Sequence, residues 1–269
     1  MKGATRLRQA QATVLRQAQT TVAILLFLWL LTACTRQGDT WQQVQETAVL
    51  QVGLDPTYPP FELFTGEELV GIDVDLAQAI GEQWGVDIEF VHFGYDGLYD
   101  ALLTEQVDVL ISALVIMPER TKDFAYSDPY FNAGEILIVP AGTDDIEEMA
   151  DLNGRSLAVE LGSQGHLLAT EWERKLPDLT IVPFNTPDEA LTAVRQQTAA
   201  AALTDQISGR LFLKENPGLK RLDPPVAVEP YAIVVRADDA QLRKQLNNSL
   251  EQLRSSGKLD AILQAWLDS

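Results

Sequence analysis

Short apolar runs alternate along this chain with segments in which apolar residues recur every three or four positions. The runs predict strands, and the periodic segments predict helices. In the first half we expect strands at residues 49–53, 69–72, 86–90, 107–112 and 135–140, and helices at residues 73–84 and 96–105. This alternation predicts an α/β fold with a mainly parallel sheet.

A second series of the same kind follows the polar turn at residues 141–145. We expect strands at residues 156–160, 181–182, 200–204 and 231–236, and helices at residues 164–175, 186–197, 205–215, 238–256 and 259–266. Two similar series with two crossings between them predict two lobes. Small-molecule sites usually lie in a cleft between lobes.

Local signals mark the starts of two helices. Asp73 is predicted to cap the helix that ends at Gly85, because apolar residues spaced by four follow it. The run Thr-Pro-Asp-Glu that begins at Thr186 predicts a second start, with a capping threonine and a proline in the first helical position.

The first 33 residues have the pattern of a secretory signal. They contain four basic residues, no acid and an apolar stretch at residues 22–31. The stretch of about ten residues is shorter than the ~20 that span a bilayer, although an uncleaved anchor helix is the alternative. Cys34 follows Leu-Thr-Ala, which resembles the lipobox of bacterial lipoproteins and implies cleavage and lipidation at Cys34. Residues 34–47 are then predicted to be a polar tether.

Composition narrows the function classes. The chain has 20 basic and 39 acidic residues, and this acidic balance disfavours binding to nucleic acid. The single cysteine excludes an internal disulfide. The sequence contains no metal-ligand spacing, no nucleophile motif and no phosphate-binding glycine loop, so we expect no metal and no cofactor. The two histidines, His92 and His166, are interpreted as incidental.

Six motifs in order make the chain similar to a known family. They are Gly-Leu-Asp-Pro-Thr-Tyr-Pro-Pro-Phe at 53–61, Gly-Ile-Asp-Val-Asp-Leu at 71–76, Tyr-Asp-Gly-Leu at 95–98, Asp-Val-Leu-Ile-Ser at 108–112, Pro-Glu-Arg at 118–120 and Phe-Ala-Tyr-Ser-Asp-Pro-Tyr at 124–130. Together they resemble the extracytoplasmic solute-binding proteins of polar amino-acid ABC transporters, the family-3 type, over residues 48–269.

The resemblance implies a two-lobed periplasmic-binding-protein fold (type II) with two hinge strands and the ligand in the interlobe cleft. Lobe 1 would comprise residues 48–138 and 231–269, and lobe 2 residues 139–230. The ligand would bridge the lobes and shift the population toward a closed state.

The resemblance also assigns roles around a bound amino acid. Arg120 would pair with the α-carboxylate through its planar fork, which lysine lacks. The amides of Gly162 and Ser163, between a strand and a helix, would point at the same carboxylate. Asp205 would bind the α-ammonium group. A surface arginine and a simple helix cap are the alternatives for Arg120 and Asp205.

Three further residues match positions around the ligand side chain. Tyr58 and Tyr95 match an aromatic pair that packs on it, with ordinary core packing as the alternative. Asp55 matches an acid that some members place near the side-chain head, but it is equally well explained as a turn residue before Pro56.

Two departures alter the carboxylate site. Family members carry Ser or Thr two positions after the pair Ser112-Ala113, whereas this chain has Val115. The family threonine after Gly-Ser is here Gln164. A lost hydroxyl donor to a charged group costs ~1.5–3 kcal/mol if nothing replaces it, so the backbone amides of Val115 and Gln164 are expected to act instead.

The resulting hypothesis is a monomeric, lipid-anchored receptor outside the cytoplasmic membrane. It would bind a polar amino acid, deliver it to the permease subunits of an ABC importer and perform no catalysis. One alternative is an enzyme similar to the periplasmic dehydratases of prephenate or arogenate, with Glu135 or Glu160 as its acid. Another is a module that presents ligand to a separate sensor.

Overall fold

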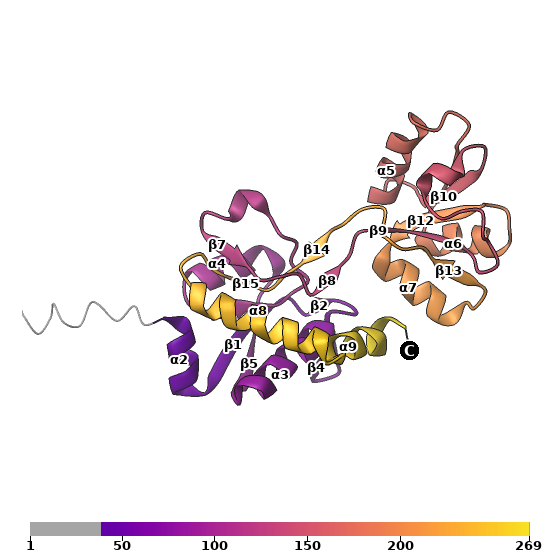
Figure 1. The fold of residues 1–269 in the computed structure, drawn as a ribbon. Coiled ribbons are helices and arrows are strands. Elements are labelled where there is room, and N and C mark those ends of the chain that lie inside the picture. The colour runs from indigo at the N-terminus through magenta and orange to yellow at the C-terminus, as the bar shows by residue number, and fades with distance from the viewer. Residues whose placement is uncertain (1–38, 269) are drawn as a thin grey trace, which may run out of the picture. The chain divides into compact units, whose positions relative to one another are not determined.

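The computed structural model describes residues 39–268. The predicted signal, Cys34 and the first part of the predicted tether lie outside these residues. The described chain is organised around two five-stranded sheets, and each sheet takes its strands from a different part of the sequence (Figure 1). The alternating pattern of strands and helices is therefore confirmed, and its organisation into two sheets is described below.

The first sheet has the order β5-β1-β6-β15-β7. Its strands are β1 (Val49–Leu54), β5 (Asp87–His92), β6 (Val109–Leu110), β7 (Phe124–Tyr126) and β15 (Val234–Arg236). β1 runs parallel to β5 and β6, whereas β15 is antiparallel to its neighbours. The sheet is thus mixed, because the chain returns to it after visiting the second sheet.

Helices cover both faces of the first sheet (Figure 1). Helices α3 (Ile72–Trp84), α8 (Ala240–Ser255) and α9 (Lys258–Leu267) share one apolar cluster with Leu50 and Val52. Helix α4 (Leu98–Leu103) shares a separate cluster with Leu110 and Val234. Successive residues of β6 thus point into opposite clusters, as the alternation of a strand requires.

The second sheet has the order β11-β10-β12-β9-β13. Its strands are β9 (Glu135–Pro140), β10 (Ser156–Glu160), β11 (Thr180–Phe184), β12 (Ala201–Asp205) and β13 (Leu219–Arg221). Strands β11, β10 and β12 are parallel to one another, and β9 runs antiparallel to both of its neighbours, β12 and β13. Helix α5 (Gln164–Glu173) packs on one face, and helices α6 (Pro187–Arg195) and α7 (Gln206–Glu215) pack on the other.

Shorter elements connect these parts. A three-stranded sheet is formed by β2 (Thr57–Tyr58), β3 (Glu62–Thr65) and β4 (Glu68–Val70). Three short 3₁₀ helices are η1 (Tyr95–Gly97), η2 (Pro118–Arg120) and η3 (Met149–Leu152). The chain leaves the first sheet through β8 (Phe131–Asn132) and returns through β14 (Pro230–Tyr231), which pair with each other. The second crossing lies where the sequence predicts it, but the first lies earlier than the predicted boundary at residue 138, because β9 already belongs to the second sheet.

The prediction of a tether is wrong for residues 40–47. These residues form helix α2 (Thr40–Thr47), in which Val44 is fully buried in the cluster of α3 and α8. The ring of Trp41 lies 4.7 Å from that of Trp84, edge to face. Trp41 and Val44 are three residues apart and therefore lie on one face of the helix. Two apolar residues among polar neighbours were too few to predict this helix from the sequence.

Helix α2 should contribute measurably to stability. We expect Val44→Ala to lower the free energy of unfolding by about 2 kcal/mol, because it leaves a cavity in a closed cluster. Gln43→Ala, on the exposed side of the same helix, should change it by less than about 0.5 kcal/mol. Urea unfolding of both variants tests this, and equal midpoints would show that α2 does not dock on the cluster.

Several predicted boundaries also change. The helix expected at residues 96–105 is divided into η1 and the shorter α4, and the strand expected at 107–112 is reduced to β6. The strand expected at 231–236 is divided between β14 and β15. Among residues 39–268, no helix combines the length and the apolar character needed to cross a membrane.

Candidate functional site

Three predicted site residues meet at one edge of the first sheet. Strands β1, β5 and β6 are parallel neighbours, so the segments that follow them emerge at the same edge. The N–H of Asp55 donates to Oγ of Ser112 at 3.0 Å, and the N–H of Tyr95 donates to Oδ2 of Asp55 at 2.9 Å. The structure therefore brings Asp55, Tyr95 and Ser112 together.

Asp55 uses its carboxylate inside this cluster. Oδ1 accepts a hydrogen bond from the hydroxyl of Thr57 at 2.9 Å, and Oδ2 accepts the one from Tyr95. These are the bonds of a turn residue. The second bond also fixes the backbone of Tyr95, at the start of η1, beside the end of β1.

Ser112 and Ala113 are held by two buried acids that the sequence analysis missed. The hydroxyl of Ser112 donates to Oε1 of Glu62 at 2.7 Å, and the N–H of Ala113 donates to Oδ2 of Asp73 at 2.6 Å. Ala113 has a φ of 46°, which is unusual for a residue with a side chain. The hydroxyl of Ser112 and the N–H of Ala113 therefore donate within the protein and are not free donors for a ligand.

The prediction that Asp73 caps a helix is wrong. Gly71 occupies the N-cap of α3 without any side-chain bond, and Asp73 is the second residue of the helix. Its carboxylate reaches across to the segment after β6 instead. Burial raises the pKa of Glu62, and the charge of Asp73 raises it further. In the sequence, Asp73 lies inside one matched motif and Glu62 directly follows another.

Tyr58 belongs to an aromatic cluster at the same edge. Its ring stacks on Phe61 with a centroid distance of 5.6 Å, and its hydroxyl lies 3.3 Å from the hydroxyl of Tyr231. Tyr58 remains 43% exposed, so one ring face is open to a ligand. Tyr231 also forms an isolated bridge with Val115. Beside that bridge, the N–H of Ile116 donates to the carbonyl of Pro230 at 3.2 Å, and the carbonyl of Leu114 accepts from the N–H of Ala232 at 3.0 Å. This pattern leaves the N–H of Val115 directed away from Tyr231.

Arg120 ends η2 and is exposed. Its guanidinium carbon lies 4.2 Å from the ring centroid of Tyr99, a buried residue of α4. Among residues 39–268, Arg120 forms no ion pair with an acid. The stacking orients the planar fork while leaving its N–H groups available, which suits an incoming carboxylate.

Hydrogen bonds within the loop and to the first turn of α5 hold the loop before α5 in place. The N–H of Gly162 donates to Nδ1 of His166 at 3.0 Å, and the N–H of Ser163 donates to the carbonyl of Glu160 at 3.2 Å. Oγ of Ser163 caps α5 by accepting from the N–H of His166 at 3.1 Å. The amides of Gly162 and Ser163, predicted to bind a carboxylate, are thus occupied. Gln164 begins the helix and is exposed.

His166 was interpreted as incidental, and the structure gives it a positioning role. It is the acceptor for Gly162, whose φ of 83° lies in the left-handed region that favours glycine. In the sequence, this contact corresponds only to a histidine four residues after a glycine.

Asp205 ends β12 and caps α7. Its Oδ1 accepts from the N–H groups of Ile207 at 3.0 Å and Ser208 at 2.8 Å. In the antiparallel ladder it lies directly opposite Glu135, the first residue of β9. Asp205 also contributes to the raised pKa of Tyr58 in β2, after burial of that hydroxyl.

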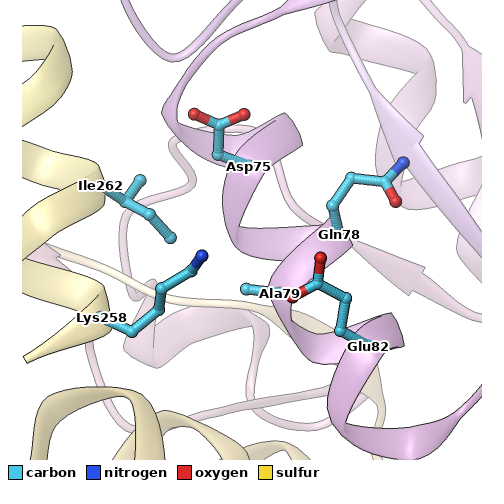
Figure 2. Close-up of a pocket in the computed structure, with 6 residues that line it drawn as sticks. All are labelled: Asp75, Gln78, Ala79, Glu82, Lys258 and Ile262. Atoms are coloured by element: carbon cyan, nitrogen blue, oxygen red, sulfur yellow. The ribbon is translucent and has the colours of Figure 1, made fainter. Parts of the chain in front are cut away.

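A separate surface cavity lies between α3 and α9. It has a volume of about 280 Å³ and is lined by Asp75, Gln78, Ala79, Glu82, Lys258 and Ile262. Figure 2 shows Lys258 extending from α9 toward Ala79 and Glu82. Nε1 of Trp266 donates to Oδ2 of Asp75 at 2.7 Å. None of the predicted site residues lines this cavity. We interpret it as a gap left where the two helices pack against each other.

Sequence comparison matches nearly all of the described chain to one family. The model described as bacterial extracellular solute-binding proteins, family 3, matches residues 50–269. The arginine-binding extracellular protein ArtP of Bacillus subtilis (strain 168) is 28% identical over 242 residues, covering 88% of this chain and 92% of that protein. The L-cystine-binding protein TcyJ of Escherichia coli (strain K12) is 29% identical over 231 residues, covering 83% and 84%.

Solved structures share the fold. An ancestral cationic amino acid solute binding protein is 32% identical with a TM-score of 0.64, covering 85% of this chain and 99% of that one. The L-cystine solute receptor of Neisseria gonorrhoeae, in its unliganded open conformation, has a TM-score of 0.77 at 24% identity, covering 86% and 98%. The chain therefore has the two-lobed α/β fold of these proteins and belongs to the bacterial extracellular solute-binding proteins of family 3.

Proposed function

We propose that this protein is the solute-binding component of an ABC importer and that its ligand is a polar amino acid. It would act outside the cytoplasmic membrane, anchored by a lipid on Cys34, and deliver the ligand to the permease subunits as a monomer. The two lobes, one around each five-stranded sheet, would be joined at β8 and β14. Membership of the family and the names of its amino-acid-binding relatives support this assignment.

The observation that carries the proposal is the arrangement of Arg120. An exposed guanidinium, stacked on a buried tyrosine and without an acid partner among the described residues, is a ready site for a carboxylate. Asp205 supplies the opposite charge for an ammonium group, and the open face of Tyr58 supplies an apolar contact. An amino acid carries all three complementary groups.

The donors at the carboxylate differ from those that the sequence suggested. Because Ser112, Ala113, Gly162 and Ser163 are engaged within the protein, the remaining candidates are Arg120 and the N–H groups of Val115 and Gln164. We propose that these three form the carboxylate site. Arginine is the first ligand to test, since two of the relatives above are named for arginine or cationic amino acids.

Thermal melting of the mature chain against single amino acids tests this function. We expect L-arginine, L-lysine or L-glutamine to raise the melting temperature by about 5 °C or more at a hundred times its dissociation constant, because binding adds ~2.7 kcal/mol of stability. L-aspartate serves as the control, because its side chain repeats the negative charge of Glu160, Asp205 and Glu229. The absence of a shift with every common amino acid would overturn the proposal.

An enzyme is a second candidate because of one observation. Glu135 is buried, and burial together with Asp205, Glu229 and Glu160 raises its pKa to about 7. A general acid needs such a raised pKa. A solved ancestral cyclohexadienyl dehydratase is 25% identical, with a TM-score of 0.72. Incubation with arogenate, followed by chromatography of the products, tests this candidate, and lack of turnover would exclude that reaction.

A further inference from the structure

Glu135 and Asp205 form a pair of facing acids. They are direct partners in the antiparallel ladder between β9 and β12, so their side chains lie on the same face of the sheet. Like charges in this position repel each other. Only 5% of Glu135 is exposed, so solvent does little to screen it. To be stable when buried, two facing carboxyl groups need either a proton on one of them or a cation nearby.

The free oxygen of Glu135 points toward the loop assigned to the ligand. Oε2 is buried and accepts no hydrogen bond from any of the described residues. A Cβ added to Gly165 would lie 2.8 Å from this atom, so Oε2 is directly below the first turn of α5. Gly165 follows Gln164, whose N–H is a proposed carboxylate donor. The unpartnered carboxyl oxygen therefore lies at the edge where the amino-acid backbone would bind.

The charged groups around Glu135 are acids. Asp205 faces it from β12, Glu160 from the end of β10 and Glu229 from the segment before β14, and each raises its pKa beyond the effect of burial, to about 7. On α5, His166 uses Nδ1 as an acceptor for Gly162. Tyr58, from β2, is within electrostatic reach of Asp205 and Glu229. Among the described residues, the charged groups that act most strongly on Glu135 are all acids.

We propose that Glu135 is a ligand-responsive carboxyl group that holds a proton in the empty site and releases it to solvent when the α-ammonium group of the ligand binds beside Asp205. This inference rests on the proposed function. The proton makes the facing pair compatible with burial while the site is empty. A cation within ~4–6 Å stabilises the ionised form, so binding and loss of the proton favour each other.

The consequence is an affinity that depends on pH. Where the empty site holds the proton and the occupied site does not, affinity rises with pH by linkage. We expect binding to be about tenfold weaker at about pH 6 than at about pH 8, with about half a proton released per ligand near neutral pH.

Isothermal titration calorimetry with L-arginine tests the proposal. If the melting screen selects another amino acid, that amino acid replaces arginine. Titrations in phosphate and in Tris at the same pH count the released protons, because the buffers differ in ionisation enthalpy. We expect Glu135→Gln to abolish the proton release and to reduce the pH effect to less than about threefold. Glu173→Gln, at the far end of α5, makes the same charge change and should behave like the wild type.

A second measurement needs no variant. In protein labelled with carbon-13 at the glutamate carboxyl groups, one resonance should titrate near neutral pH in the empty protein and at lower pH with L-arginine bound. Equal proton release by the wild type and Glu135→Gln, or no such resonance, would overturn the inference while leaving amino-acid binding intact. If the wild type binds no amino acid, the proposed function fails and this inference fails with it.

Discussion

Replacing Arg120 with alanine should weaken amino-acid binding by about a hundredfold or more while hardly changing the stability of the ligand-free protein. Truncating one partner of a charge-assisted, desolvated pair typically costs about 2–5 kcal/mol of binding free energy. In the free protein the guanidinium is exposed and contacts the ring of Tyr99, an interaction of about 0.5–1 kcal/mol. Calorimetric binding and thermal melting of the same sample measure both quantities.

Two further variants sharpen this result. Arg120→Lys keeps the charge but loses the planar fork, so we expect an intermediate affinity. Lys122→Ala removes an exposed cation two residues away and should leave binding unchanged. Retained affinity in Arg120→Ala would remove this residue from the site, and a fall in stability of several kcal/mol would show that its role is structural.

Replacing Gly71 with alanine should destabilise the protein by about 4 kcal/mol. Gly71 has a φ of 141°, and a Cβ at this position would lie 2.0 Å from the carbonyl oxygen of Phe61. The same carbonyl accepts the N–H of Asp73 at 3.0 Å, so the backbone cannot move away without losing that bond. The displaced segment lies between Tyr58 and Glu62, and ligand affinity should therefore fall as well.

Gly66 provides the matched control. It also has a positive φ, 70°, but nothing lies within 4 Å of an added Cβ. Gly66→Ala should cost only the backbone strain, about 1 kcal/mol. Urea unfolding of both variants separates strain from steric overlap. Equal losses would show that the backbone near Phe61 yields freely, which would contradict the close approach described here.

Local signals in the sequence were accurate where one segment contains the whole cause. Strands β9 and β10 begin and end as predicted, because each is an apolar run bounded by polar turns. The cap at Thr186 is confirmed by its bond from the N–H of Glu189 at 3.2 Å. Helix α2 was missed because its stability comes from packing on α3 and α8 rather than from its own polar sequence.

The candidate site was predictable only in part. The motifs that resemble the family named positions that the structure brings together, as the bonds among Asp55, Tyr95 and Ser112 show. They did not show how those positions are used. The donors of Ser112 and Ala113 are taken by Glu62 and Asp73, which are 50 and 40 residues away in the chain.

The sequence by itself determined the family and the alternation of strands and helices. These follow from periodicity, capping residues and ordered motifs, all of which act over short stretches of chain. Only the tertiary structure decided which donors remain free and which acids face each other. The pairing of Glu135 with Asp205 depends on strand register, and the raised pKa of Glu135 depends on burial and on acids from three other segments. Burial and charge act through space, so no local pattern contains them.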